Sequence, residues 1–258
     1  MDDEILELIK EAYQPDICIR SEEIFINEEA FRERTASFMT EDRVRGVMYD
    51  GKMEDFIDPE ELTKAKENLD DNKKVLVYGV GAGFITTGNL YIYCDLARWE
   101  IQLRYRKGMR NFIINNPDED SLKKIKRGFF LDWRISDKHK LEMFDEIDYV
   151  IDSNVVHEPN MITGEAFREG LKQVVKRPFR LVPYFDPGVW GGQWMKEVCD
   201  LDKTQDNFAW SFDGVPEENS IYLRYGDVRV EIPAMDVVLY QPAELRGWRS
   251  ISGVKGRY

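Results

Sequence analysis

The apolar positions in the first two thirds of the chain fall into helical spacings and strand-length runs. Residues 3–13 place apolar side chains three and four positions apart, which predicts an amphipathic helix. Residues 74–80 form a continuous apolar run with charge before it and glycine after it, which predicts a central parallel strand covered on both faces. Shorter runs at residues 90–95, 128–133 and 148–152 are further predicted strands.

Capping residues mark helix starts between these runs. Asp58 stands before Pro59 and two glutamates, so we predict a helix that Asp58 caps and that ends near residue 68. Thr163 is the predicted cap of a further helix with one apolar face. Because strands and helices alternate, residues 1–176 are predicted to form an α/β layer structure.

The pattern changes at residue 177. From there on, short runs of aromatic and β-branched residues replace the helical spacing, and turns rich in Pro, Gly, Asn and Asp separate them. The runs cover residues 179–185, 208–212, 221–225, 228–232 and 237–240. This pattern predicts antiparallel β structure. We therefore place a domain boundary near residue 176, with one domain over residues 1–176 and another over residues 177–258.

A glycine-rich segment follows the predicted strand at residues 74–80. Its spacing does not fit a dinucleotide site, because Phe84 stands where the third glycine of G-x-G-x-x-G belongs, and the next strand begins too soon for a crossover helix. The phosphate-binding motif G-x-x-x-x-G-K-[ST] occurs nowhere in the chain. Residues 79–83 are therefore predicted to be a close-packed turn.

Charge is distributed unevenly along the chain. The 258 residues carry a net charge of −13. Residues 1–70 carry −12, from 21 acidic and 9 basic residues, whereas residues 98–140 carry +6, from 12 basic and 6 acidic residues. An acidic total lacks the continuous basic surface that nucleic-acid binding requires, so we expect no nucleic-acid partner. The basic middle segment favours a small anionic ligand instead.

Composition indicates a folded protein of the cytoplasm. The many aromatic residues exclude disorder as the main state, and no apolar run approaches the roughly 20 residues that span a bilayer. The acidic start of the chain lacks the basic residues of a secretory signal, and the three cysteines are too widely spaced for a disulfide framework. We therefore expect a cytoplasmic localisation, reduced thiols and no membrane partner.

The predicted strand at residues 90–95 ends in Asp95, and a helix is predicted over residues 96–107. In open α/β sheets, ligands lie at the carboxyl ends of strands. Basic residues recur along one stripe of this helix, and guanidinium groups suit phosphate oxygens. The stripe consists of Arg98, Gln102, Arg106 and Arg110 at four-residue spacing, with Arg104 and Lys107 beside it. The candidate ligand-binding residues are Asp95, Arg98, Arg104 and Arg106. The alternative is an exposed helix face that pairs with the acidic first part of the chain.

Residues 75–83 and 90–107 resemble the later half of a uridine-kinase-type P-loop fold. In that fold one strand ends in a glycine turn, the next ends in Asp, and an arginine-bearing helix follows. The resemblance covers roughly residues 55–175 and implies a nucleoside-kinase-like α/β domain. Because the chain has no P-loop lysine to contact the β- and γ-phosphates, we expect a degenerate domain without hydrolysis.

Residues 177–197, which contain Val-Trp-Gly-Gly-Gln-Trp, resemble the opening of type I mannose-6-phosphate isomerases, as do residues 207–212. These are cupin-fold zinc enzymes that interconvert mannose 6-phosphate and fructose 6-phosphate. The chain as a whole resembles a long bacterial form, in which a kinase-like region precedes the isomerase. The resemblance implies that Trp190 is a wall of the sugar pocket.

The chain departs from that family at the metal site. The family takes its zinc ligands from a Gln-x-His pair, a Glu and a later His, but no histidine follows His157 here, and Ser211 stands where the family has Glu. We therefore expect an incomplete cupin-type β region without catalytic residues, metal ligands or cofactor of its own, zinc belonging only to the full-length family. Both His139 and His157 are expected at the surface, with the lysines around His139 lowering its pKa.

Three functional hypotheses follow. The first is an isomerase-related protein that is inactive alone, or that a second chain completes. The second is a phosphate-ligand module, for a nucleotide or a sugar phosphate, without catalysis. The third is an active kinase that obtains its phosphate-binding loop from elsewhere. Because an incomplete β region leaves strand edges unpaired, self-association is also expected.

Overall fold

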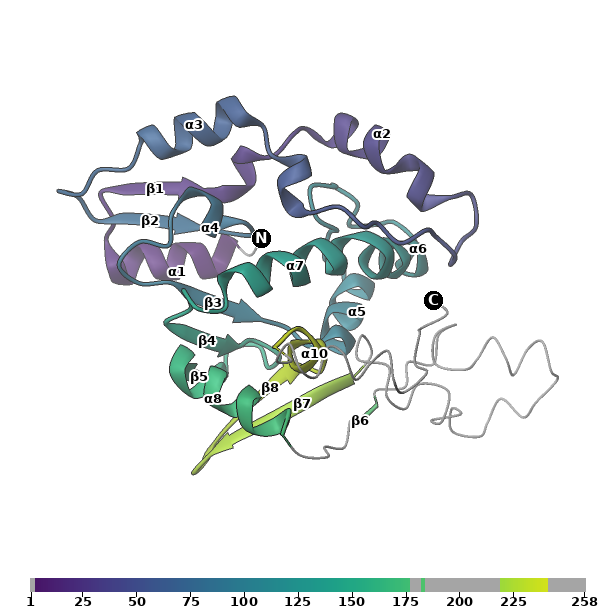
Figure 1. The fold of residues 1–258 in the computed structure, drawn as a ribbon. Coiled ribbons are helices and arrows are strands. Elements are labelled where there is room, and N and C mark those ends of the chain that lie inside the picture. Colours follow the sequence, from purple (N-terminus) through teal and green to yellow (C-terminus); the bar gives the residue numbers. More distant parts are fainter. Residues whose placement is uncertain (1–2, 177–181, 184–218, 241–258) are drawn as a thin grey trace. The chain divides into compact units, whose positions relative to one another are not determined.

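The computed structural model describes residues 3–176, 182–183 and 219–240 (Figure 1). The chain divides into two compact units. The first unit comprises residues 1–91, 110–119 and 126–146, and the second comprises residues 92–109, 120–125 and 147–258. The described residues form a mixed α/β structure of small sheets without a barrel. None of their helices combines the length and the apolar character that crossing a membrane requires.

The first unit consists of short helices around a two-stranded parallel sheet. Its elements are α1 (Asp3–Tyr13), β1 (Ile17–Arg20), η1 (Ser21–Ile24), α2 (Glu28–Met39), η2 (Met53–Phe56), α3 (Pro59–Glu67), β2 (Val75–Tyr78), α4 (Ala82–Ile85), the π-helix η3 (Gly128–Asp132) and α7 (Trp133–Met143). Residues from most of these elements share one apolar core. Its most buried members include Ile24, Phe31, Met53, Phe56, Leu131 and Ile135.

The strand predicted at residues 74–80 forms and is parallel to its neighbour, with Ile17 opposite Val75. The prediction that it is a central strand was wrong, because within the described residues β2 pairs only with β1. All four residues of β2 are half-buried. The continuous apolar run therefore reflects partial cover by helices and not burial between two neighbouring strands.

The predicted start of α3 is confirmed. The Asp58 side chain accepts hydrogen bonds from the backbone N–H groups of Glu60, at 2.9 Å, and of Glu61, at 3.3 Å, and Pro59 occupies the first turn. These bonds satisfy two of the N–H groups that have no partner within the helix.

The predicted strand at residues 128–133 was wrong, since this segment is the π-helix η3, which continues into α7. Leu131 and Ile135 lie four positions apart and are both fully buried, which is the spacing of one helix face. A short apolar run does not distinguish a strand from a buried helical segment. The backbone carbonyl of Phe130 accepts a 2.9 Å hydrogen bond from the N–H of Tyr49.

The turn predicted at residues 79–83 is confirmed over residues 79–81, whereas residues 82 and 83 begin the short helix α4. Gly79 and Gly81 have φ angles of 124° and 81°, which side chains rarely allow. A Cβ atom on Gly81 would lie 2.7 Å from Cζ of Phe25, so the turn is also closely packed. The hydroxyl of Ser21 donates a 2.8 Å hydrogen bond to the carbonyl of Val80 and fixes the turn to the end of β1.

The second unit is built around a three-stranded sheet. Its elements are β3 (Ile92–Asp95), α5 (Arg98–Arg106), most of α6 (Ser121–Arg127), β4 (Tyr149–Asp152), β5 (Asn160–Thr163), α8 (Gly164–Val174), β6 (Val182–Pro183), β7 (Asn219–Tyr225), β8 (Val228–Pro233) and α10 (Met235–Tyr240). The strand order is β3-β4-β5, with β3 parallel and β5 antiparallel to β4. The strands predicted at residues 90–95 and 148–152 are thus confirmed.

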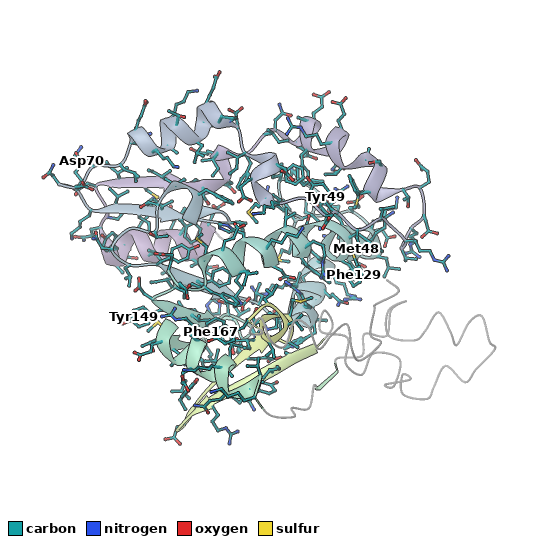
Figure 2. All side chains as sticks on the ribbon, in the orientation of Figure 1. Met48, Tyr49, Asp70, Phe129, Tyr149 and Phe167 are labelled. Carbon is teal, nitrogen blue, oxygen red and sulfur yellow. The ribbon has the colours of Figure 1, made fainter. Side chains whose placement is uncertain are left out.

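The helix predicted after Thr163 is α8. The Thr163 hydroxyl accepts a 3.1 Å hydrogen bond from the backbone N–H of Ala166, as expected of an N-cap. Phe167 and Leu171 on α8 are fully buried. Figure 2 labels Phe167 together with Tyr149 of β4, the strand at the centre of this sheet.

The antiparallel pattern predicted after residue 177 is confirmed for β7 and β8, which form a hairpin. Its turn contains Gly226, whose φ is 59°. Residues 237–240 were wrongly predicted as a strand and belong to α10, where the three consecutive residues Met235, Asp236 and Val237 are all buried instead of every second one. The run at residues 208–212 lies outside the described residues, and the boundary near residue 176 stays a prediction.

Candidate functional site

Asp95 lies at the carboxyl end of β3, directly opposite Asp152 at the end of the parallel strand β4. Its carboxylate accepts a 3.0 Å hydrogen bond from the N–H of Leu96, and its carbonyl accepts a 3.1 Å bond from the N–H of Ser153. Both aspartates are buried. The two parallel strands therefore bring two carboxylates to the edge at which α/β sheets bind ligands.

The carboxylate of Asp152 organises the loop that follows β4. Its Oδ1 accepts hydrogen bonds from the backbone N–H of Asn154, at 2.9 Å, and from the side-chain amide of Asn154, at 2.7 Å. Its Oδ2 accepts a 2.7 Å bond from the backbone N–H of Glu231 on β8. The Asn154 side-chain oxygen then accepts a 2.8 Å bond from the N–H of Ala97, the residue that precedes α5.

Glu231 connects this loop with both the hairpin and α5. One carboxylate oxygen, Oε1, accepts hydrogen bonds from the indole Nε1–H of Trp99, at 2.6 Å, and from the hydroxyl of Ser220, at 2.5 Å. The side chain is 7% exposed. A buried carboxylate needs such donors, since burial of an unpaired charge is costly.

The basic residues of α5 do not form one exposed row. Arg98 is buried at the start of the helix, whereas Arg106 is exposed and donates a 3.0 Å hydrogen bond to the carbonyl of Gln102. Arg104 donates from Nε to Glu100 at 2.7 Å and from Nη2 to the carbonyl of Ser153 at 2.6 Å. Of the three candidate arginines, Arg106 therefore offers the most accessible guanidinium.

The predicted stripe also ends earlier than its spacing suggested. Because α5 ends at Arg106, Arg110 is not on this helix, and it belongs to the other unit. The alternative prediction was that the basic residues pair with acids in the first part of the chain. Arg104 pairs instead with Glu100, one turn earlier on α5. Lys107 follows the last residue of the helix and is exposed.

Within the described residues, no group of three or more His, Cys, Asp and Glu side chains is arranged to hold a metal ion. The oxygens of Asp152 and Glu231 instead accept hydrogen bonds from N–H and O–H groups. Asp152, Asn154 and Glu231 connect the end of β4, the start of α5 and the hairpin through hydrogen bonds.

Sequence reasoning identified Asp95 as a candidate site residue. It did not identify the hydrogen-bonding roles of Asp152, Asn154 and Glu231, and it considered Asp152 only as half of a metal site with His157, which two ligands do not complete. The order Asp-Ser-Asn directly after a predicted strand is a signal for a side chain that bonds its own backbone two residues later. Glu231 stands in the run at residues 228–232, where a lone acid between apolar residues marks a buried polar group. Trp190 lies outside the described residues.

The two histidines differ in their surroundings. His157 is exposed, as predicted. His139 was wrongly predicted at the surface, since it is 5% exposed and stacks on Phe84 with ring centroids 4.1 Å apart. Its pKa is lowered as expected, but burial is the cause, not the neighbouring lysines, and Glu142 acts in the opposite direction. Neither ring nitrogen has a hydrogen-bond partner among the described residues.

Comparisons with known proteins give one match. A family model with the description "Domain of unknown function (DUF8485)" matches residues 1–176. No curated protein and no solved structure matches the chain. Because the matching model covers well over half of the 258 residues, the chain belongs to the family described as Domain of unknown function (DUF8485).

Proposed function

We propose that the chain is a mannose-6-phosphate isomerase-related protein that does not catalyse the isomerisation alone. The sequence around Trp190 and the β hairpin formed by residues 219–233 support the relationship. The observation that supports inactivity is the hydrogen bonding of two buried acids, Glu231 in that hairpin and Asp152 next to it. Asp152 and Glu231 accept five hydrogen bonds between them and serve as structural acceptors.

Aldose–ketose isomerisation in this family needs a metal ion that polarises the sugar carbonyl and a base that moves a proton between adjacent carbons. A base must reach the substrate proton with a carboxylate oxygen or a similar group. The oxygens of Asp152 and Glu231 are directed to donors of the chain itself. Neither acid therefore supplies the base in the described arrangement.

An activity assay tests this proposal. The purified chain is incubated with zinc and mannose 6-phosphate, and fructose 6-phosphate is measured by a coupled reaction, with an active isomerase as positive control. We expect a rate equal to that of the protein-free mixture. Turnover that rises with the amount of chain and disappears with a chelator would overturn the proposal.

A second function, the binding of a phosphate-bearing small molecule, is favoured by the end of α5. Arg106 and Lys107 are adjacent, exposed and cationic, in the same unit as the buried Arg98. An exposed guanidinium presents a planar set of donors that matches phosphate oxygens. In this proposal Arg106 is the phosphate contact, and Arg98 and Arg104 keep the helix in place.

Calorimetric titration separates binding from a purely structural helix face. ATP and mannose 6-phosphate are titrated into the wild type, Arg106→Ala and Arg224→Ala, and uridine serves as the ligand without phosphate. Arg224 is an exposed arginine of β7 in the same unit and is the matched control. We expect Arg106→Ala alone to weaken binding of the phosphate ligands. Equal affinities for all three proteins, or no binding at all, would show that the arginines are structural.

The same samples test for an active kinase. ATP, magnesium and uridine are incubated with the wild-type chain, and the products are separated by chromatography. We expect no uridine monophosphate above the protein-free background, because the chain has no lysine in a phosphate-binding loop. Phosphorylated uridine that increases with the amount of chain would replace the binding proposal with a catalytic one.

A further inference from the structure

The hairpin β7–β8 and the helix α5 are far apart in sequence but share the buried side chain of Glu231. Trp99 is the second residue of α5, and its indole N–H donates to Glu231 across 132 positions of sequence. The hairpin also reaches the residue before α5, because Asn154 bonds both the Asp152 carboxylate and the N–H of Ala97. Two hydrogen-bonded routes therefore lead from β8 to the first turn of α5.

The N-cap position of α5 carries no capping side chain. Ala97, the residue at the N-cap position, has no side chain that can accept a hydrogen bond from the helix. The N–H of Ala97 is bonded instead by Asn154, a residue of the loop after β4. Asn154 in turn is held by Asp152, to which Glu231 donates its backbone N–H. The backbone N–H of the residue at the N-cap position is therefore bonded by an acceptor from outside the helix.

The hairpin is in turn held at its other end. The Tyr225 hydroxyl donates a 2.5 Å hydrogen bond to the carbonyl of Ala166 on α8. A Cβ atom on Gly170 would lie 2.5 Å from that hydroxyl and 3.0 Å from the Leu223 side chain, so β7 packs closely on α8. The hairpin that carries Glu231 is thus also held by α8.

We infer that Glu231 is a positioning residue through which the C-terminal hairpin fixes the first turn of α5 and, with it, the helix that carries Arg106. The carboxylate acts as an acceptor for Trp99 and Ser220, so its hydrogen-bonding capacity matters more than its charge. The inference about the helix stands on the contacts alone. Its consequence for ligands rests on the proposed binding of a phosphate by α5.

Two substitutions of Glu231 separate acceptor capacity from charge. Glu231→Gln retains a side-chain oxygen for the Trp99 N–H, whereas Glu231→Leu leaves that indole without its acceptor. Ser220→Ala removes a second donor to Glu231 and leaves the contact with Trp99, and it is the matched control. All variants are made in the full chain and compared by hydrogen–deuterium exchange with mass spectrometry.

We expect amides of residues 97–102 to exchange about tenfold faster in Glu231→Leu, because a buried donor left without a partner costs the folded helix start. Glu231→Gln and Ser220→Ala should retain the exchange of the wild type there. Amides of α8 should be unchanged in all four proteins, which shows that the unit is still folded.

Wild-type exchange of residues 97–102 in Glu231→Leu would overturn the inference. Equal acceleration in α5 and α8 would also overturn it, because Glu231 would then act on stability in general. The inference also requires that residues 97–102 exchange at the wild-type rate in Glu231→Gln. Exchange in Glu231→Gln as fast as in Glu231→Leu would contradict the acceptor role of this side chain.

Titration of ATP tests the consequence for ligands with the same proteins. If the wild type binds ATP, affinity should fall in Glu231→Leu and be restored in Glu231→Gln. Unchanged affinity in Glu231→Leu would separate the helix start from ligand binding and overturn the consequence. If the wild type binds no ATP, the phosphate proposal fails, while the exchange experiment still decides whether Glu231 positions α5.

Discussion

The imidazole of His139 stacks on the ring of Phe84, with centroids 4.1 Å apart and an angle of 27° between the planes. The two residues come from α7 and α4, and Phe84 follows the glycine turn at the end of β2. Since His139 is buried without a hydrogen-bond partner among the described residues, its neutral form fits this position and its protonated form does not.

This relationship predicts how stability depends on pH. Burial lowers the pKa of His139 below its ordinary value of 6.5, so the unfolded chain binds a proton that the folded chain does not. The contribution to stability is fully present above pH 6.5 and is lost as the pH falls towards the lower folded pKa. The slope for one proton is at most about 1.4 kcal/mol per pH unit.

Urea unfolding between pH 7.5 and pH 5.0 measures this dependence. In His139→Phe the part of the slope between pH 6.5 and pH 5.0 should disappear, because phenylalanine also stacks on Phe84 but does not titrate. His157→Gln is the control, since His157 is exposed and its loss should leave the slope unchanged. An identical slope in the wild type and in His139→Phe would contradict the assignment.

Truncation of the Asp152 side chain should reduce the stability of the protein strongly, because its carboxylate accepts three hydrogen bonds. Asp152→Ala removes the acceptor for the N–H of Glu231 and for both nitrogens of Asn154. Buried donors left without acceptors cost about 1–3 kcal/mol each, so we expect a decrease of at least about 2 kcal/mol in the free energy of unfolding. Glu158→Ala removes an exposed acid of the same loop and should change it by less than about 0.5 kcal/mol.

Gly81 and Gly88 allow the cost of a close contact to be separated from the cost of backbone strain, because both have positive φ angles, 81° and 58°. A Cβ atom on Gly81 would lie 2.7 Å from Phe25, whereas the nearest atom to one on Gly88 is 3.9 Å away. Gly88→Ala should therefore cost only the backbone strain, about 1 kcal/mol, and Gly81→Ala should cost clearly more. Thermal unfolding of both variants compares them directly, and equal shifts in midpoint would show that the contact with Phe25 relaxes freely.

The cap of α3 gives a smaller effect. In Asp58→Ala the N–H groups of Glu60 and Glu61 lose their acceptor, and we expect a loss of about 1 kcal/mol in the free energy of unfolding. Asp58→Asn keeps a side-chain oxygen and should remain within a few tenths of the wild type. A loss of the same size in Asp58→Asn would mean that the charge and not the cap is what α3 requires.

The sequence was sufficient to predict those features that depend on contacts between residues close together in the chain. Asp58 and Thr163 bond backbone groups two or three residues away, so their capping roles were predictable. The strand pair β3–β4 and the hairpin β7–β8 were recognisable from runs of apolar residues. The segments at residues 128–133 and 237–240 were not, because a short apolar run has the same composition in a strand and in a buried helical turn.

The candidate site was only partly predictable for a related reason. Asp95 was found because it ends a strand, but the partner of Asp152 lies 79 positions away at Glu231, and no spacing rule connects them. The burial of Arg98 and the exposure of Arg106 depend on how the unit packs around α5. Both arginines fit the same four-residue stripe, so their sequence spacing could not separate them.

The long interval between Asp152 and Glu231 has a consequence for biosynthesis. While the ribosome is still translating the intervening residues, Asp152 has been made and its acceptor Oδ2 has no Glu231 N–H to bind. The carboxyl edge of β3 and β4 therefore cannot reach its final form during most of translation, and contacts of such long range are slow to form. We expect this edge and the start of α5 to reach their final arrangement only after the β7–β8 hairpin has been synthesised.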